Sequence, residues 1–438
     1  MVKKEQVLEA LSQIIDPDFQ RDIVSLGFIK ELKIEGSEVS FSIELTTPAC
    51  PLKPVFEEQA KSLVGGLDDV ESVQVKMTAR KTTKRRIAVE ESGLKKVGQI
   101  LAVSSCKGGV GKSTMAAMLA RTLVQQGLSI GLLDADIYGP SIPTLFRSHE
   151  MGVEGTPDRK LRPREIDGLK LMSFGFLAGD GPAVLRGPLV AQYMQQLLHQ
   201  VDWGELDILI IDMPPGTGDI QLTISQSVQL DGAVIVTTPH QLALADVRKG
   251  ILMFEKVDVP VLGVLENMAR FICDDCGKTH HLFGKGGAEL LQERFGLDTL
   301  AEIPIVGSLE ASLHTLVETP IAKEATEAVI RALGKNALQR PATPEVEFDA
   351  NFITLRWPDT NEEARVPNRA LRAACSCALC IDELTNAPLL DPATIPDDIH
   401  AEQVGIIGNY AVSVDWSDGH NTGFFPYSTF RRLASASS

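Results

Sequence analysis

The chain has 438 residues, with 42 basic and 58 acidic side chains and a net charge of −16 at pH 7. This length predicts roughly three domains of ~150 residues, and the acidic balance argues against nucleic acid or an anionic membrane as a partner. No apolar run approaches the ~20 residues that span a bilayer, so we expect a cytoplasmic protein without a signal or transit peptide. Seven cysteines, most of them in two tight clusters, favour metal ligation in a reducing compartment over disulfides.

Residues 1–80 predict a small α/β domain, in the order helix, strand, strand, helix, strand. Cys50 precedes Pro51, which suits the first turn of a helix, so we expect Cys50 to be the N-cap residue. A thiol in that place has a lowered pKa and can bind metal or react, although a half-buried cap without chemistry is the alternative. The segment resembles the MIP18-type (DUF59) domain of iron–sulfur assembly factors. A basic stretch at 80–86 then predicts a solvated linker over residues 81–96.

A glycine-rich loop follows the apolar run 99–105 and leads into a helix that begins near Lys112. Backbone N–H groups of such a loop surround an anion, and the helix directs its positive end at the same phosphates. Lys112 is expected to neutralise the β and γ phosphate oxygens and the Ser113 hydroxyl to ligate Mg²⁺. Cys106 replaces the glycine that usually opens the loop. The predicted nucleotide-binding residues of this loop are Lys107, Gly108, Gly109, Val110, Gly111, Lys112, Ser113 and Thr114.

Lys107 is a second lysine in the same loop. One lysine already serves the local nucleotide, so we expect Lys107 to act in a partner subunit, as an arginine finger does. The alternative is a solvated surface lysine. The KGGVGK spelling resembles the deviant Walker A loop of the MinD/ParA/nitrogenase-iron-protein class, in which this lysine reaches the nucleotide of the other subunit. That resemblance implies a homodimer.

Residues 97–335 alternate buried strands and helices, which predicts a doubly wound, mostly parallel α/β sheet covered on both faces. The expected strands are 100–104, 130–133, 169–174, 208–211, 233–237 and 261–265. Ligand chemistry should gather at their carboxyl ends. Asp212 ends one strand and is expected to hold Mg²⁺ through water. Asp134 and Asp136 end another, where capping is the alternative role, and the turn 214–219 could sense the γ-phosphate.

Four segments of this domain resemble the Mrp/ApbC family of iron–sulfur carrier ATPases. They are DADIYGPS at 134–141, RGP at 186–188, IDMPPGTGD at 211–219 and ENM at 266–268. The resemblance implies ATP as nucleotide, with its adenine recognised by the amide of Asn267. It also implies that Asp136 orients or deprotonates the attacking water and that Asp134 supports the metal shell. Cys106 and the three-domain layout are most similar to the chloroplast branch that supplies four-iron clusters, and to its bacterial relatives.

Cys273 and Cys276 form a CxxC pair, which supplies half of a tetrahedral site. In the Mrp family this pair lies at the dimer interface, where two copies hold one bridging [4Fe–4S] cluster. A zinc site completed by His280 or His281, or purely structural thiols, is the alternative. Members of the plant branch do not generally keep both cysteines, whereas this chain does.

A proline-containing stretch at 339–344 marks a boundary before a small β-rich domain over residues 345–435. This part resembles the DUF971 domain, which is related to the N-terminal domain of γ-butyrobetaine hydroxylase. The resemblance implies a structural Zn²⁺ site of Cys₃His type, a stoichiometry typical of closed zinc sites. A second iron–sulfur site and plain core packing are the alternatives. The ligands would be Cys375, Cys377, Cys380 and His420.

The sequence therefore predicts a dimeric ATPase that hydrolyses ATP slowly, with Lys107, Lys112 and Asp136 as catalytic residues. It would take [4Fe–4S] clusters from an upstream scaffold and pass them to apo iron–sulfur proteins. A MinD/ParA-like positioning ATPase is one alternative, but it needs a basic face or amphipathic tail, and the tail at 431–438 is short and polar. A reductase like nitrogenase iron protein is the other, but its cluster cysteines lie in two separate segments.

Overall fold

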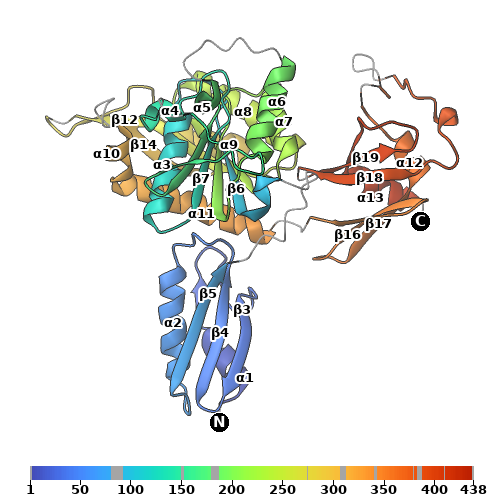
Figure 1. The fold of residues 1–438 in the computed structure, drawn as a ribbon. Coiled ribbons are helices and arrows are strands. Elements are labelled where there is room, and N and C mark those ends of the chain that lie inside the picture. Colours follow the sequence, from blue (N-terminus) through green and yellow to red (C-terminus); the bar gives the residue numbers. More distant parts are fainter. Residues whose placement is uncertain are drawn as a thin grey trace.

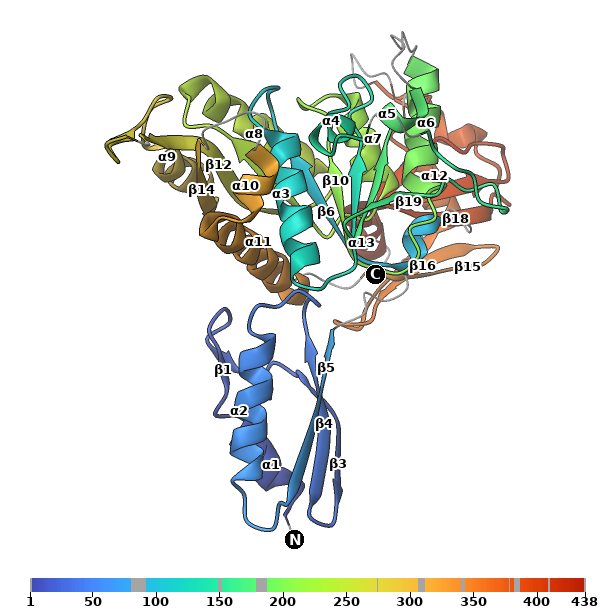
Figure 2. The same cartoon turned by 60° about the vertical axis from the view of Figure 1, so that its left-hand side comes forward.

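The computed structural model describes the chain except for residues 1, 80–91, 149–151, 179–186, 274, 306–311, 340–342, 378, 382–386, 409 and 437–438. The described residues form an N-terminal, a central and a C-terminal unit (Figures 1 and 2). The basic stretch 80–86, the arginine of the RGP segment and residues 340–342 of the 339–344 boundary lie outside the described residues. Among the described residues, no helix has both the length and the apolar composition that crossing a bilayer requires.

The N-terminal unit is a three-stranded sheet of order β3-β4-β5 with two main helices, which confirms the predicted small α/β domain. Strand β4 buries every second side chain from Val39 to Leu45, as expected for a sheet with one face on a core. Its elements are α1 (Lys4–Leu11), β1 (Ile15–Asp16), β2 (Arg21–Asp22), β3 (Ile29–Glu35), β4 (Glu38–Leu45), α2 (Lys53–Gly65) and β5 (Ser72–Ala79).

The predicted role of Cys50 as a helix cap with a lowered pKa is wrong. Helix α2 begins at Lys53, with Leu52 as its N-cap residue, because a turn closed by the Lys53 N–H to the Cys50 carbonyl delays the helix. The Cys50 side chain instead packs against the apolar core of the N-terminal unit. Burial raises the pKa of this thiol, so the N-terminal end of α2 does not activate it.

The central unit is built on a nine-stranded sheet of order β13-β12-β11-β6-β10-β7-β9-β8, with β14 paired to β12. Its interior pairs are parallel, and helices pack on both faces (Figure 1). The strands are β6 (Val97–Ser104), β7 (Ile130–Asp134), β8 (Arg164–Ile166), β9 (Leu169–Ser173), β10 (Leu206–Asp212), β11 (Gly232–Thr237), β12 (Val261–Ile272), β13 (Thr279–His280) and β14 (Thr299–Ile305). The helices are α3 (Lys112–Gln125), α4 (Ile142–Leu145), α5 (Gly175–Ala178), α6 (Gly187–His199), α7 (Asp219–Ser227), α8 (Gln241–Lys256), α9 (Gly287–Phe295), α10 (Ser312–Val317) and α11 (Pro320–Gln339).

All six strands predicted for this domain are present, and the predicted fold class is confirmed. Strands β6, β7, β10 and β11 are predictable because each contains a continuous apolar run whose side chains are buried on both faces. The antiparallel edge strands β8 and β13 are short and carry no such signal. The unit also begins earlier than predicted, because a short 3₁₀ helix at Gly93–Lys96 buries Leu94 in the central core.

The C-terminal unit contains two antiparallel three-stranded sheets, β15-β16-β17 and β18-β19-β20, around a separate apolar core. This confirms the predicted small β-rich domain. Its elements are β15 (Glu345–Phe348), β16 (Phe352–Trp357), β17 (Glu362–Pro367), α12 (Asn368–Ala373), a 3₁₀ helix (Pro392–Thr394), β18 (Ala401–Ile407), β19 (Ala411–Trp416), β20 (Phe424–Pro426) and α13 (Tyr427–Ala436).

Candidate functional site

The predicted phosphate-binding loop lines a cleft of about 420 Å³ at the carboxyl edge of the central sheet. Gly109 and Gly111 have φ values of +79° and +87°, in the left-handed region that glycine adopts most readily. The loop therefore curls between β6 and α3 and directs backbone N–H groups to one point. The side chains and backbone that line the cleft belong to Ser105, Lys107, Gly108, Gly109, Gly111, Lys112, Ser113, Thr114, Asp136, Pro140, Ser141, Thr144, Leu145 and Pro215.

Lys112 and Asp212 form a buried ion pair beneath this cleft. The Lys112 Nζ lies 2.5 Å from Asp212 Oδ1 and 3.3 Å from the Ser113 hydroxyl. Asp212 is fully buried at the end of β10, and its Oδ2 has no hydrogen-bond partner among the described residues. A buried carboxylate oxygen without a partner is costly, so Oδ2 fits a role in the water shell of a divalent cation. Ser113 and Asp212 are therefore a suitable donor set for Mg²⁺.

Asp134 and Asp136 lie on the neighbouring strand end but make different contacts. Asp134 is fully buried, and it accepts hydrogen bonds from the Asp136 and Ile142 N–H groups and from the Ser173 hydroxyl. Burial, with the nearby charge of Asp212, raises the pKa of Asp134 to about 7. Asp136 lines the cleft, and its Oδ1 accepts a separate hydrogen bond from the Gly139 N–H at 3.1 Å. Asp134 thus shapes the loop that presents Asp136 to the cleft.

Lys107 is paired within its own chain. Its Nζ lies 3.5 Å from Asp246 Oδ2 on α8, and its side chain is 39% exposed. Asp246 also pairs with Lys249 at 2.9 Å. Lys107 is therefore not a freely solvated lysine. Its contact with Asp246 holds it at the rim of the cleft, and this contact is exposed enough for a stronger anion to replace Asp246.

Cys106, which departs from the usual loop glycine, fits against a glycine of α8. A Cβ placed on Gly250 would lie 2.6 Å from the Cys106 sulfur, so α8 accommodates the thiol only because residue 250 has no side chain. Burial raises the pKa of Cys106 to about 11. This thiol is a packing group of the loop and not a reactive one.

Asn267, predicted from the family resemblance to recognise adenine, contacts the loop backbone. Its Nδ2 donates to the Val110 carbonyl at 2.9 Å, and a Cβ on Gly111 would lie 2.2 Å from the same nitrogen. Asn267 is 7% exposed and lies on β12. In the described structure this amide ties the phosphate-binding loop to β12.

Cys273 and Cys276 lie at the tip of the hairpin formed by β12 and β13. The Cys273 N–H donates to the Lys278 carbonyl, and the Gly277 N–H donates back to the Cys273 carbonyl, which closes a tight turn. The hairpin projects from the edge of the central unit away from the C-terminal unit (Figures 1 and 2). Three large apolar side chains within ten residues of the pair in the chain are exposed. They are Ile272, Leu282 and Phe283, at 46%, 63% and 40%.

The zinc alternative for this pair finds no support in the described structure. Among the described residues, Cys273 and Cys276 do not belong to any group of three or more metal-binding side chains with ligand atoms within 4.8 Å of one another. His281 uses Nδ1 for the Ala269 carbonyl at 3.2 Å, and His280 is exposed. A single chain thus offers two thiols at this point.

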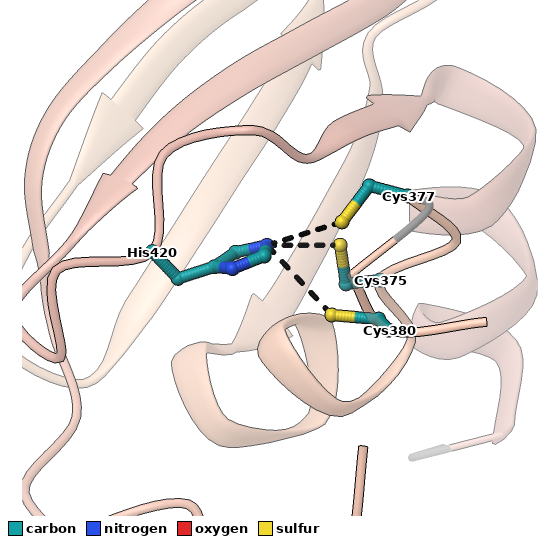
Figure 3. A group of neighbouring side chains, drawn as sticks. All are labelled: Cys375, Cys377, Cys380 and His420. Carbon is teal, nitrogen blue, oxygen red and sulfur yellow. Dashed lines mark hydrogen bonds between the residues drawn. The ribbon is translucent and has the colours of Figure 1, made fainter. Parts of the chain in front are cut away.

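The four predicted ligands of the C-terminal unit converge on one point (Figure 3). The His420 Nε2 lies 3.2, 3.6 and 3.8 Å from the sulfurs of Cys375, Cys377 and Cys380, and all four ligand atoms fall within 4.8 Å of one another. Tetrahedral zinc with bonds of ~2.0–2.3 Å requires ligand atoms about 3.5 Å apart, so the set fits Zn²⁺. The cysteines follow α12, and His420 comes from the turn between β19 and β20.

Several further residues, which the sequence did not indicate, support this ligand set. Arg372 directs Nη1 at the Cys380 sulfur at 3.5 Å and binds Asp418 through Nε at 2.9 Å. Burial raises the pKa of Cys375 to about 12. Burial also opposes ionisation of Cys377, but hydrogen bonding, first from Thr422, outweighs it and lowers the Cys377 pKa to about 7. Residues that hold a ligand indirectly carry no motif, so only the folded structure identifies them.

Comparison with known proteins assigns all three units. Residues 96–336 match the family described as NUBPL iron-transfer P-loop NTPase, residues 4–77 match iron-sulfur cluster assembly protein, and residues 345–431 match gamma-butyrobetaine hydroxylase-like, N-terminal. The chloroplastic Fe-S cluster assembly factor HCF101 of Oryza sativa is 43% identical over 98% of this chain and 83% of its own length. The iron-sulfur cluster carrier protein of Deinococcus radiodurans is 42% identical over 75% of this chain and 94% of its own length.

One solved structure is also similar in sequence. A nucleotide-binding protein from Archaeoglobus fulgidus, solved in complex with ADP, is 40% identical over 60% of this chain and 95% of its own length, with a TM-score of 0.46. The family matches and the long relatives above confirm the resemblance predicted from the sequence motifs: this chain belongs to the NUBPL-type iron-transfer P-loop NTPases.

Proposed function

We propose that this protein hydrolyses ATP and carries [4Fe–4S] clusters, received from an upstream scaffold, to apo iron–sulfur proteins. Two copies would hold the cluster between them through Cys273 and Cys276 of each. The observation that carries the proposal is the course of β12. Asn267 on this strand contacts the phosphate-binding loop, and the same strand runs on into the hairpin that bears the cysteine pair.

The cleft supports ATP hydrolysis. Lys112 would turn from Asp212 to the β and γ phosphates, and Ser113 and Asp212 would hold Mg²⁺, which supplies charge neutralisation when bound. Asp136 would orient a water for attack on the γ-phosphorus. The bond from that phosphorus to the bridging oxygen breaks, leaving ADP and phosphate. Asn267 remains our proposed contact for the adenine, in addition to its bond to the loop.

Lys107 is the proposed link between the two copies. Its pairing with Asp246 is exposed at the surface, and such pairs contribute only about 0–1 kcal/mol. A triphosphate on the facing subunit carries more negative charge than one carboxylate, so it would draw Lys107 away from Asp246. ATP would thus favour a dimer, and hydrolysis would weaken it.

The hairpin supports cluster binding at the dimer interface. A four-iron cluster takes four thiolates, and the hairpin of one chain offers two. Ile272, which is 46% exposed directly before Cys273, would be covered when two hairpins meet. The nucleotide would bind the closed and open dimers with different affinity, and the resulting shift between the two dimers would load or release the cluster.

The C-terminal Cys₃His set is proposed to bind structural Zn²⁺. Its ligands are buried or half-buried within the apolar core of that unit, and Arg372 offsets the charge of three thiolates. Such a closed set leaves no position for a substrate, in contrast to the exposed hairpin pair.

The test is anaerobic reconstitution of the full chain with iron and sulfide. Cys273→Ala with Cys276→Ala should remove ~4 iron atoms per dimer and abolish transfer to an apo acceptor, because each cluster would lose its thiolates. Cys50→Ala, which removes a cysteine from the N-terminal unit, is the matched control and should change neither. Lys112→Ala should keep the cluster but lose ATP hydrolysis. Retention of iron and of transfer by the double variant would show that the carrier site lies elsewhere.

A further inference from the structure

Helix α7 joins the nucleotide cleft to the C-terminal unit. It begins at Asp219, directly after the turn 214–218 that was predicted to sense the γ-phosphate, and Pro215 of that turn lines the cleft. Helix α7 ends at Ser227 and lies on the side of the central unit that faces the C-terminal unit (Figure 1). A helix of nine residues is about 13 Å long and moves as one rigid piece. Contacts at its two ends are therefore mechanically linked.

Gln221 makes the contact at the cleft end. Its side chain is 1% exposed, and its Nε2 donates to the Pro214 carbonyl and, at 3.3 Å, to the hydroxyl of Ser104 at the end of β6. Its Oε1 is buried without a partner among the described residues. The adjacent Gly216 N–H binds the Ser105 carbonyl at 2.9 Å. The position of this turn against the phosphate-binding loop thus depends on where α7 lies.

Tyr410 and Gly408 make the contact at the far end, from the turn between β18 and β19. The Gln226 Nε2 donates to the Tyr410 hydroxyl at 3.1 Å, and the ring of Tyr410 packs against the central core. Gly408 has a φ of +51°, and a Cβ there would lie 2.9 Å from the Ser225 carbonyl oxygen. The backbone of Gly408 therefore lies directly on the last turn of α7, at a distance that only glycine permits.

The same turn is fixed to the rest of the C-terminal unit. The Tyr410 carbonyl accepts from the Tyr427 N–H at 2.8 Å, where α13 begins, and Ala411 starts the strand that leads toward His420. At the helix, the Ser225 hydroxyl binds the Gln221 carbonyl at 2.9 Å. Each end of α7 thus contacts a different functional element, and neither contact involves a predicted catalytic or metal-binding residue.

We propose that the C-terminal unit regulates the nucleotide turn through α7, with Gln221 as a positioning residue for that turn and Gly408 and Tyr410 as the docking residues. This inference rests on the proposed binding of ATP at the cleft. A nucleotide that shifts the turn 214–218 moves α7 against Gly408 and Tyr410. By reciprocity, a C-terminal unit that holds α7 in place changes the affinity for nucleotide by the same factor.

Hydrogen exchange on the full chain, with and without a non-hydrolysable ATP analogue and Mg²⁺, tests this coupling. In the wild type the analogue should change exchange in peptides covering 214–227 and also in those covering 401–416, by about five-fold or more. Tyr410→Phe removes only the hydroxyl that accepts from Gln226, and Gly408→Ala pushes the turn off the Ser225 carbonyl. Both variants should keep the response in 214–227 and lose it in 401–416.

Two matched variants control for the chemistry of each change. Tyr193→Phe removes a tyrosine hydroxyl from α6, where the ring packs against Phe174, and Gly127→Ala strains a glycine with φ +84° that has open space around it. Both should respond like the wild type. If the analogue binds and changes 214–227 but leaves 401–416 of the wild type unchanged, or if the response survives in both docking variants, the coupling is wrong. If the wild type binds no nucleotide at all, the proposed function is wrong and the coupling falls with it.

Discussion

Replacing Gly111 by alanine should destabilise the central unit more than the same change at the other two glycines of the phosphate-binding loop. The three positions form a graded series. Gly108 has no left-handed φ and no atom within 4 Å of an added Cβ, whereas Gly109 has a φ of +79° but also open space. Gly111 has a φ of +87°, and its Cβ would lie 2.2 Å from Asn267 Nδ2. Strain and steric overlap can therefore be separated by comparison.

The magnitudes follow from these geometries. A left-handed φ costs a residue with a Cβ ~1–2 kcal/mol, and this applies to both Gly109→Ala and Gly111→Ala. At Gly111 the amide of Asn267 must also leave the Val110 carbonyl, 2.9 Å away, and it has nowhere to find solvent because the residue is 7% exposed. An unsatisfied buried group costs ~1–3 kcal/mol. We expect losses of about 0 kcal/mol at Gly108, ~1–2 at Gly109 and ~2–5 at Gly111.

Hydrogen exchange of β6 amides as a function of urea, without nucleotide, isolates unfolding of the central unit from that of the other two units. Adding Asn267→Ala to Gly111→Ala should recover part of the loss, because the overlapping group is gone. The same addition to Gly109→Ala should recover nothing. The reasoning is refuted if Gly111→Ala is no more destabilising than Gly109→Ala, or if removing Asn267 gives no relief.

Burial, with Glu302 and Glu289 nearby, raises the pKa of Glu266 to about 7. The folded protein therefore binds a proton at Glu266 more tightly than the unfolded chain does, and the free energy of unfolding falls as pH rises from about 4.5 to 7. Glu266→Gln should remove up to ~3 kcal/mol of that fall, because glutamine does not titrate. Urea unfolding of the wild type and the variant at pH 5 and 8 measures the difference, and identical pH profiles of the two would contradict the prediction. At the Cys₃His set, a Cβ on Gly423 would lie 2.7 Å from the Cys375 sulfur, so Gly423→Ala should weaken zinc binding in a chelator competition. Gly419→Ala, strained at φ +80° with open space around it, is the control, and equal zinc affinity of the two variants would show that the overlap does not matter.

The sequence by itself determined the fold class, the family and the presence of the chemical groups. Strands such as β6 and β10 are buried on both faces, and a continuous apolar run bounded by turns is a local signal that needs no tertiary information. The phosphate-binding loop and the two cysteine clusters are likewise local, because their chemistry depends on residues that are close in the chain.

Only the tertiary structure decided which of these groups face each other and which instead serve to stabilise the fold. Asp134 satisfies the backbone of its own loop, Lys107 pairs with Asp246, and Cys50 is buried in a core, because burial and long-range contacts set the environment of each group. The partners of α7 are separated from it by up to 184 positions in the chain, and no local pattern encodes them. Contacts at such separation arise only when the units fold and pack, which is why the contacts of α7 with the C-terminal unit could be found only in the structure.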